Sequence, residues 1–340
     1  MNRTLMLAAA GVGGYLAWRA LRPRYDFRDK TVIVTGGSRG LGLVIARELA
    51  ARGARLAICA RDEPELRDAA EDLRRRGARV VAATCDLTDR ADIRRFVAAV
   101  RDQLGPVDVL INNAGVIGVG PFEEMRPEDF DLSLKIHVWA PYFATLEVLP
   151  DMKARRAGRI VNIASIGGKI AVPHMLPYVT GKFGLVGLSN GLRAELAKDG
   201  IGVTTVCPGL MRTGSPAHAE FKGRHEEEYA WFAAGASAPG LTMSAESAAR
   251  RVIDACACGD AEVVLGLPYK LAVAVQGIAP GLATGALALV NRLVLPDPGG
   301  VGPRRVPGRE SRGKIPAAVT VLSDRAAVAN NETHPTPPNL

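Results

Sequence analysis

A glycine-rich turn between an apolar strand and a helix is the feature that most constrains how this chain folds. Residues 31–35 are β-branched and apolar and predict a buried strand. Glycines follow at positions 36, 37, 40 and 42, and residues 43–50 continue with a helical pattern. Glycines placed in this way let the backbone approach a pyrophosphate, which binds at a helix N-terminus. Glycines also mark ordinary tight turns. The strand before this motif and the helix after it favour a dinucleotide-binding turn.

The alternation of strands and helices predicts one α/β domain. The chain has 340 residues, of which 48% are apolar, and this is enough for one sizeable core. Strand-like runs alternate with helical stretches, and they fall at 31–35, 55–60, 79–84, 107–111, 159–164, 202–207 and 262–265. The order predicts a single Rossmann-like, doubly wound domain with a seven-stranded parallel sheet and helices on both faces. Ligands of such sheets bind at the carboxyl ends of the strands.

A tyrosine and a lysine lie four residues apart in a helical segment. Tyr178 and Lys182 therefore share one face of the predicted helix, with Cβ atoms about 5–6 Å apart. A phenol titrates at about pH 10, and a neighbouring ammonium favours the phenolate. The pair would then suit acid/base chemistry at neutral pH. Alone, such a pair is more often a packed aromatic ring and a solvated charge.

Further motifs follow the predicted strands in order and give the pair its meaning. They are Asp86 after the third strand, Asn112-Asn113-Ala114-Gly115 after the fourth, Ser165 after the fifth, and Pro208-Gly209 with Thr213 after the sixth. With the spacing Thr-Gly-x-x-x-Gly-x-Gly at 35–42, this set resembles the short-chain dehydrogenase/reductase family of the classical type. The resemblance covers roughly residues 29–266. It implies an oxidoreductase that moves a hydride between a nicotinamide cofactor and a carbonyl or secondary alcohol.

The resemblance also implies roles for single residues. Tyr178 would donate or abstract the proton, Ser165 would stabilise charge on the substrate oxygen, and Lys182 would lower the pKa of Tyr178 and hold the nicotinamide ribose. A serine nucleophile is the competing idea for Ser165, but no Gly-x-Ser-x-Gly elbow surrounds it. The expected cofactor-binding residues are Gly36, Ser38, Arg39, Gly40, Leu41, Gly42, Arg61, Asp86, Leu87, Asn113, Tyr178, Lys182, Pro208, Gly209 and Thr213.

Charge near the second strand favours NADP(H) over NAD(H). An NAD site places an acidic residue at the end of that strand to hold the ribose hydroxyls. Ala60 occupies this place here, and Arg61 follows it, while Arg39 lies in the glycine-rich turn. Two guanidinium groups suit a 2′-phosphate. The alternatives are that Arg61 is a solvated loop residue, or that Asp62 reaches the ribose in a shifted register.

One position departs from the family pattern. Many classical members carry an asparagine in the fourth helix region that supports a water-mediated proton relay to the lysine. The corresponding residue here is His137. We hold two interpretations open for His137: a relay residue, which would make it a fourth catalytic residue, and a satisfied buried polar residue.

The two ends of the chain lie outside the resemblance. Residues 1–28 contain an uncharged apolar run, 5–18, followed by a basic linker, and we expect a membrane anchor with the catalytic domain, 29–266, on the cytoplasmic side. A helix of this run would span about 21 Å against roughly 30 Å of hydrocarbon, so a packed or solvated helix is the alternative. Residues 267–295 predict an apolar helical extension broken at Pro280. Residues 296–340 predict a largely irregular tail.

Composition and charge limit the partners. The net charge of +8 fits an anionic membrane surface and a phosphorylated cofactor, but no aromatic residues interleave the arginines, so we expect no nucleic-acid partner. The five cysteines lack a metal or redox spacing, and we expect no metal. A homo-oligomer is left open.

The substrate is less constrained than the reaction. The segment 210–243 over the expected site carries Met211, Phe221, Tyr229, Trp231 and Phe232. This content suggests an apolar carbonyl or alcohol as the small-molecule substrate. The alternative is that these side chains pack against one another within the segment 210–243, which we call the lid. The alternative function is a catalytically weak NADPH-binding protein that acts as a membrane scaffold or sensor.

Overall fold

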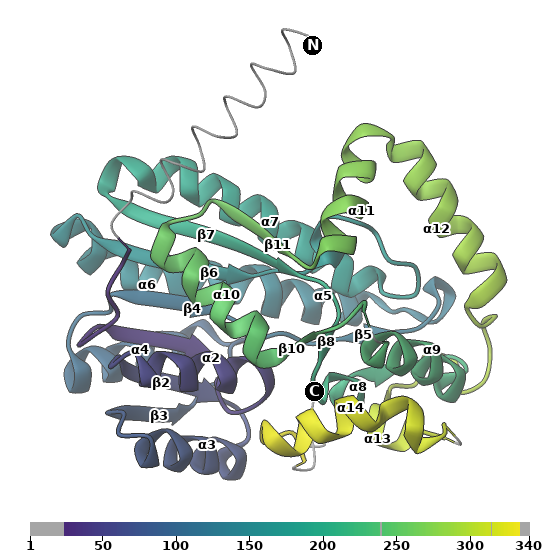
Figure 1. The fold of residues 1–340 in the computed structure, drawn as a ribbon, viewed down its shortest axis with the longest axis horizontal. Coiled ribbons are helices and arrows are strands. Elements are labelled where there is room, and N and C mark those ends of the chain that lie inside the picture. The colour runs from purple at the N-terminus through teal and green to yellow at the C-terminus, as the bar shows by residue number, and fades with distance from the viewer. Residues whose placement is uncertain (1–23, 239, 314, 334–340) are drawn as a thin grey trace, which may run out of the picture.

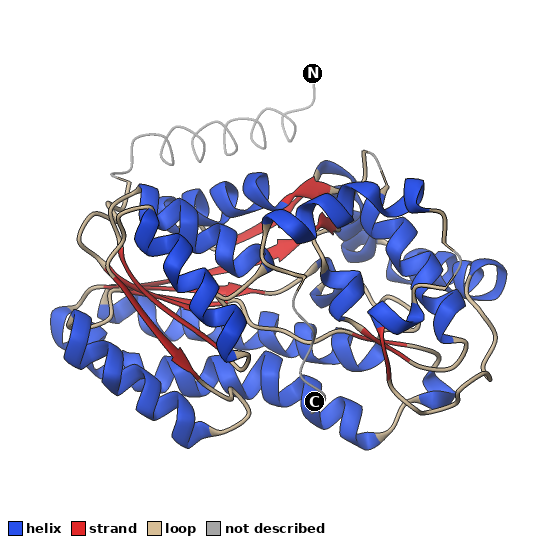
Figure 2. Cartoon of the chain, turned by 90° about the horizontal axis from the view of Figure 1, so that it is seen from below, coloured by secondary structure: helices blue, strands red, loops and turns tan. Residues whose placement is uncertain are grey.

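The fold is built on a parallel sheet of seven strands (Figures 1 and 2). The structure, a computed structural model, describes residues 24–238, 240–313 and 315–333. The strand order in the sheet is β11-β7-β6-β4-β1-β2-β3. The strands are β1 (Thr31–Thr35), β2 (Arg55–Ala60), β3 (Val80–Thr84), β4 (Val109–Asn112), β6 (Gly158–Ile163), β7 (Ile201–Pro208) and β11 (Glu262–Leu265). These bounds agree with the predicted runs to within two residues, and the predicted doubly wound α/β fold is confirmed.

Helices cover both faces of the sheet because neighbouring residues of each strand point to opposite faces. Val32 and Val34 of β1 pack in one core with α2 (Gly40–Ala51), α3 (Glu63–Arg75) and α10 (Ala245–Cys258). Ile33 packs in the other core with α4 (Arg90–Leu104) and α6 (Ala140–Arg155). All five residues of β1 are buried, as expected for a central parallel strand.

The strand order reverses direction at β1. From β1 the chain runs outward to β2 and β3, and it then returns to the other side of β1 at β4. In open α/β sheets the crevice at such a switch point is where ligands bind. The loops after β1, β4, β6 and β7 meet at this carboxyl edge, and they carry the sequence motifs described above.

A second layer of short elements covers the carboxyl edge of the sheet. It contains a two-stranded sheet, β8 (Met211–Arg212) with β10 (Met243–Ser244), and a three-stranded sheet of β5 (Gly118–Val119), β9 (Glu220–Phe221) and β12 (Val306–Pro307). Its helices are α8 (Ser215–His218), α9 (His225–Ser237), α13 (Gly308–Ser311) and α14 (Ala317–Ala329). Two further helices complete the site, α7 (Leu176–Leu196) and α5 (Pro127–Leu134), and a π-helical turn, Lys135–Trp139, joins α5 to α6.

The expectation of a largely irregular tail over 296–340 is wrong for much of that segment. Residues 306–307 add β12 to β9, and α13 and α14 follow. Tertiary packing explains the difference: α14 lies against α9 of the lid (Figure 1), where the hydroxyls of Ser237 and Ser323 are 2.8 Å apart. α14 has 13 residues, and a helix of this length is marginal in water on its own, so packing against α9 stabilises it.

The apolar extension forms two helices that project from the body of the molecule (Figure 1), α11 (Leu267–Ile278) and α12 (Pro280–Val294). The break falls at Ala279–Pro280, as Pro280 predicted. Neither helix contains a buried residue. Within the described part of the chain, no helix combines the length and the hydropathy needed to cross a membrane. The expected anchor at 5–18 lies outside the described residues.

Candidate active site

The glycine-rich turn forms one wall of a hollow at the switch point. Gly36 adopts a positive φ of 63°, and a Cβ on Gly42 would collide with the carbonyl oxygen of Gly36, so both positions require glycine. The Asn113 amide after β4 braces the turn by donating to the carbonyl oxygens of Thr35 (3.0 Å) and Gly36 (3.1 Å). The asparagine therefore sets the shape of the turn from the neighbouring strand.

Most of the predicted site residues line this one hollow, which has a volume of about 280 Å3. The predicted residues that line it are Gly36, Ser38, Arg39, Gly40, Leu41, Gly42, Arg61, Leu87, Asn113, Ser165, Tyr178, Lys182, Pro208 and Gly209. The sequence motifs, which are spread over more than 170 positions, thus meet at one edge of the sheet.

Two predicted cofactor residues do not line the hollow. The Asp86 carboxylate accepts hydrogen bonds from the backbone N–H (2.9 Å) and hydroxyl (2.8 Å) of Thr88, so it stabilises the loop that follows β3. The Thr213 hydroxyl lies 2.7 Å from that of Ser215, and Ser215 lines the hollow instead. The structure places both predicted residues beside the site and not in its wall.

Ser165, Tyr178 and Lys182 meet at one end of the hollow. Ser165 follows β6, whereas Tyr178 and Lys182 lie one turn apart on α7. The Ser165 side chain lies near the Tyr178 phenol and lowers its pKa. The Lys182 ammonium donates to the carbonyl oxygen of Ile163 (2.9 Å), and it lies 5.7 Å from the centroid of the Tyr178 ring. A strand end and a helix face thus place a hydroxyl, a phenol and a cation together.

Burial dominates the titration of this group. It raises the pKa of Tyr178 to about 12, whereas the neighbouring Ser165 lowers it. Burial also lowers the pKa of Lys182 to about 7. Burial thus outweighs any effect of Lys182 on the pKa of Tyr178 in this structure, and a lowering of that pKa by Lys182 stays a prediction. The physical reason is that desolvation disfavours charge on both groups, and a lysine that carries less charge attracts the phenolate less.

His137 is fully buried in the π-helical turn behind Tyr178. The backbone N–H of Val116 donates to His137 Nε2 (3.3 Å), and His137 Nδ1 lies 3.0 Å from the Ser133 hydroxyl. That hydroxyl donates to the carbonyl oxygen of Pro177 (2.6 Å), which leaves Nδ1 as the protonated nitrogen of a neutral ring. Burial and the nearby Lys182 hold the pKa of His137 well below its usual value. The ring also packs edge-on against Tyr178, with centroids 5.4 Å apart.

Two arginines lie at the other end of the hollow, near the end of β2. β2 ends at Ala60, as the predicted register requires, and Asp62 Oδ1 caps α3 by accepting from the N–H of Glu65 (2.9 Å). Arg61 is exposed and lines the hollow. Arg39 Nη1 pairs with Glu65 Oε2 (2.9 Å).

Glu65 is a site residue that sequence reasoning missed. Its carboxylate is buried, accepts from the Ser38 hydroxyl (2.8 Å) and pairs with Arg39, so it fixes two residues of the glycine-rich turn. An available signal was its position three residues after Asp62, which matches the spacing of a capping box. A second missed residue, Glu332, lines the hollow from the far end of the chain.

A second hollow of about 150 Å3 adjoins the first, and Tyr178 lines both. Charged side chains line it, among them Asp129, Glu220 and Arg305. Arg305 pairs with both carboxylates, at 2.9 Å and 3.4 Å. The part of the cavity next to the phenol is thus more polar than the sequence suggested.

The aromatic residues of the lid mostly pack against one another. Phe221, Tyr229 and Phe232 are buried in one cluster with Val119 and Met175. The centroid of Phe221 lies 5.4 Å from that of Tyr229 and 5.9 Å from that of Phe232. Of the predicted lid residues, only Met211 lines either hollow. This packing supports the alternative in which the aromatic side chains stabilise the lid and do not form the substrate pocket.

The family follows from a sequence match over the region that builds this site. The sequence model of the family described as short chain dehydrogenase matches residues 30–221, more than half of the chain. The chain belongs to the short-chain dehydrogenase family. It is therefore an oxidoreductase that acts on keto or hydroxyl groups with NAD(P).

Relatives and solved structures agree with this assignment. The chain is 45% identical over 183 residues to granaticin polyketide synthase putative ketoacyl reductase 1 of Streptomyces violaceoruber. The aligned region covers 53% of this chain and 67% of the relative. The fold of this chain is similar to that of an actinorhodin polyketide ketoreductase variant with NADPH (TM-score 0.63, 33% identity, 70% of this chain and 95% of the other). It is also similar to L-sorbose reductase of Gluconobacter frateurii with NADPH and L-sorbose (TM-score 0.64, 26% identity, 71% and 97%).

Proposed function

We propose that the protein reduces a ketone or aldehyde, or oxidises the corresponding alcohol, with NADP(H) and with Ser165, Tyr178 and Lys182 as its catalytic residues. The observation that carries this proposal is the contact of Ser165 with Tyr178, one helical turn from Lys182, at the end of a glycine-lined hollow. The rest of that hollow lies at the switch point of the sheet, which is where dinucleotides bind in folds of this type.

The three catalytic side chains have different roles at the substrate oxygen. The Ser165 hydroxyl donates to that oxygen and stabilises the negative charge that develops on it. The Tyr178 phenol delivers the proton in reduction and takes it back in oxidation. Lys182 stabilises negative charge left on the phenol, and its ammonium is already held at the site by the Ile163 carbonyl. The nicotinamide, when bound, supplies or accepts the hydride.

The preference for NADP(H) over NAD(H) is supported by charge around the end of β2. Arg61 and Arg39 both line the hollow, and Ala60 stands where an acidic residue would repel a 2′-phosphate. Asp62 caps a helix, which disfavours the shifted register. The two solved structures compared above, both with NADPH, are consistent with this preference.

We keep the substrate class at carbonyl compounds and their alcohols. The aromatic residues that suggested an apolar substrate pack the lid, and charged residues line the hollow next to Tyr178. An apolar substrate therefore stays a prediction. For His137, both ring nitrogens have partners, which favours a positioning role for this residue through its contact with the Tyr178 ring.

Purified protein mixed with NADPH and a broad panel of ketones and aldehydes tests the proposed function. We expect NADPH oxidation that requires a carbonyl compound. The alternative of a catalytically weak NADPH-binding scaffold gains nothing from the comparisons, which are with reductases and oxidoreductases. NADPH binding without turnover of any compound in the panel would favour that alternative.

We also propose that the protein associates with a membrane surface from the cytoplasmic side. Two features support this: the uncharged run at 5–18 with its basic linker, and the exposed apolar side chains of α11 and α12. Leu271, Leu282 and Leu293 are 66%, 71% and 70% exposed, and residues 271–291 contain no charged residue.

Sedimentation with vesicles of phosphatidylcholine and phosphatidylglycerol checks the membrane proposal. We expect the full chain to pellet with the vesicles, and removal of residues 1–24 to shift it toward the supernatant. Replacing Leu271, Leu282 and Leu293 with serine in the truncated chain measures the contribution of α11 and α12. A full chain that stays in the supernatant contradicts the proposal.

A further inference from the structure

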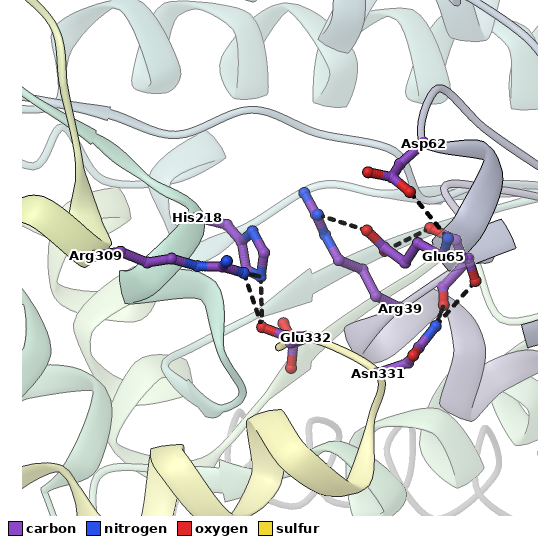
Figure 3. A network of polar contacts seen from close by, with 8 residues as sticks. Arg39, Asp62, Glu65, His218, Arg309, Asn331 and Glu332 are labelled. Atoms are coloured by element: carbon purple, nitrogen blue, oxygen red, sulfur yellow. Dashed lines mark hydrogen bonds and ion pairs between the residues drawn. The ribbon is translucent and has the colours of Figure 1, made fainter. Parts of the chain in front are cut away.

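The end of α14 directs the C-terminal segment into the glycine-lined hollow. Asn331 adopts the left-handed conformation, with φ of 60°, and the N–H of Glu332 donates to the Ala327 carbonyl oxygen (2.9 Å). These are the features of a helix C-cap, and asparagine is a residue that accepts this conformation. The cap turns the chain sharply, so that Glu332 leaves the helix axis and enters the site (Figure 3).

Contacts on both sides hold the segment in place. On the lid, the Ser323 hydroxyl lies 2.8 Å from that of Ser237. On the Rossmann domain, Arg47 of α2 donates to the Ala329 carbonyl oxygen (3.0 Å) and to the Asn330 side-chain oxygen (3.1 Å). The segment therefore bridges the lid and the cofactor half of the molecule.

The segment forms hydrogen bonds with backbone groups of the glycine-rich turn. Gly40 begins α2, and its N–H donates to the Asn330 carbonyl oxygen (2.9 Å). The Asn331 amide donates to the carbonyl oxygens of Ser38 (3.0 Å) and Glu65 (2.9 Å). The first N–H groups of such a helix are the ones that bind a pyrophosphate, because they have no partner within the helix. Here one of them already has a partner from the tail.

The Glu332 carboxylate lies against the same turn. Its Oε2 accepts from the N–H of Gly214 (2.7 Å), and a Cβ placed on Gly40 would lie 3.0 Å from its Oε1. The Glu332 carbonyl oxygen lies 2.8 Å from His218 Nε2 and accepts from Arg309 (3.3 Å). Glu332 is only 5% exposed. The tail thus brings a buried carboxyl group to the helix terminus at which the cofactor phosphates are expected.

We propose that Asn330, Asn331 and Glu332 form an autoinhibitory plug that occupies the pyrophosphate position and leaves it when the cofactor binds. The plug and the pyrophosphate need the same Gly40 amide, and a carboxylate and a phosphate at one helix terminus repel each other. The volume of about 280 Å3 left in the hollow is slightly below the range of roughly 300–1,000 Å3 for small-molecule pockets, although the lining residues are those expected to bind a dinucleotide. The proposal rests on the proposed use of NADP(H).

The charge state of Glu332 makes the docked segment releasable. Burial raises the pKa of Glu332 to about 7, while the Gly214 N–H and Arg39 lower it, and Glu65 raises it further. The docked carboxyl group therefore binds its proton more tightly than a glutamate in a released tail. The stabilisation of the docked state is complete below the ordinary pKa of about 4.5 and is lost as the pH rises through about 7. At neutral pH the segment is held by a group that is partly charged and poorly solvated.

Two single variants of the full chain test the plug, each measured by equilibrium titration with NADPH in the absence of substrate. Glu332→Ala removes the carboxylate, and Asn331→Ala removes the two hydrogen bonds to the turn. If the docked segment fills the site in 90–99% of molecules, its release lowers the apparent Kd for NADPH by about 10- to 100-fold. Glu310→Ala is the matched control, because Glu310 is an exposed glutamate of the same C-terminal region. We expect this control to bind NADPH like the unmodified chain.

Hydrogen exchange provides a readout that does not depend on activity. Saturating NADPH should speed amide exchange in residues 326–332 of the unmodified chain, because the segment is displaced. Slower exchange in that segment, or a Kd that rises or stays the same in both variants, would overturn the plug and leave the tail as a clamp on the bound cofactor or a structural element. If NADPH binds to none of the proteins, the proposed cofactor fails, and the plug fails with it. Binding to all of them with one affinity overturns the plug alone.

Discussion

Replacing Tyr178 with phenylalanine is expected to reduce turnover by about 10²- to 10⁴-fold while NADPH binding stays close to that of the unmodified protein. The substitution removes the hydroxyl that contacts Ser165 and that would transfer the proton. The aromatic ring remains, so its edge-on packing against His137 is preserved. Steady-state kinetics measures the loss of kcat, and a binding titration measures the retained affinity for NADPH.

Tyr142→Phe is the control for this substitution. Tyr142 is a partly exposed residue of α6 that packs against Trp139 and Phe143, and it lines neither hollow. The same chemical change there should leave kcat unaltered. Turnover by Tyr178→Phe at close to the unmodified rate would contradict the assignment of Tyr178 as proton donor.

Replacing Arg61 with alanine is expected to weaken NADPH binding by about 10- to 100-fold and to leave NADH binding nearly unchanged. Hydrogen bonds to charged groups are worth about 1.5–3 kcal/mol, and about 1.4 kcal/mol corresponds to a tenfold change. Only NADPH carries the 2′-phosphate that the guanidinium would bind. Arg61 is the cleaner choice of the two arginines, because loss of Arg39 would also leave the buried Glu65 carboxylate without its ion pair.

The control for Arg61 is Arg75→Ala, which removes an exposed arginine from the end of α3 and keeps the change in net charge the same. The ratio of the Kd values for NADPH and NADH separates a local contact from a general charge effect. An equal loss of affinity for both cofactors, or an unmodified protein that prefers NADH, would show that the arginines do not select the 2′-phosphate.

The sheet and the glycine-rich turn could be predicted because local sequence determines both. β1 is buried over its whole length, so its five residues read as one apolar, β-branched run. Gly36 and Gly42 occupy positions where a side chain is strained or would collide, and their spacing is therefore visible in the sequence. The ends of β1, β4, β6 and β7 then bring Asn113, Ser165 and Pro208 together through topology alone.

The remaining features depend on contacts between distant parts of the chain. Nothing in the composition of residues 296–340 indicates that α14 packs on α9 or that Glu332 reaches the hollow, because both follow from tertiary packing. Burial around Tyr178 could not be predicted from the sequence either, and in the folded protein this burial raises the pKa of the phenol. Helical spacing could place Lys182 beside the phenol, but only the folded environment decides how much charge it carries.

Deuterium transfer tests whether the protein moves a hydride from NADPH to a carbonyl carbon. The protein would be incubated with NADPH deuterated at the transferable position of the nicotinamide, together with a ketone that the panel shows to be consumed. We expect one deuterium at the former carbonyl carbon of the alcohol product, and almost no deuterated alcohol in a parallel reaction with Tyr178→Phe. An alcohol product without deuterium, or no alcohol from any carbonyl compound although NADPH binds, would contradict this expectation.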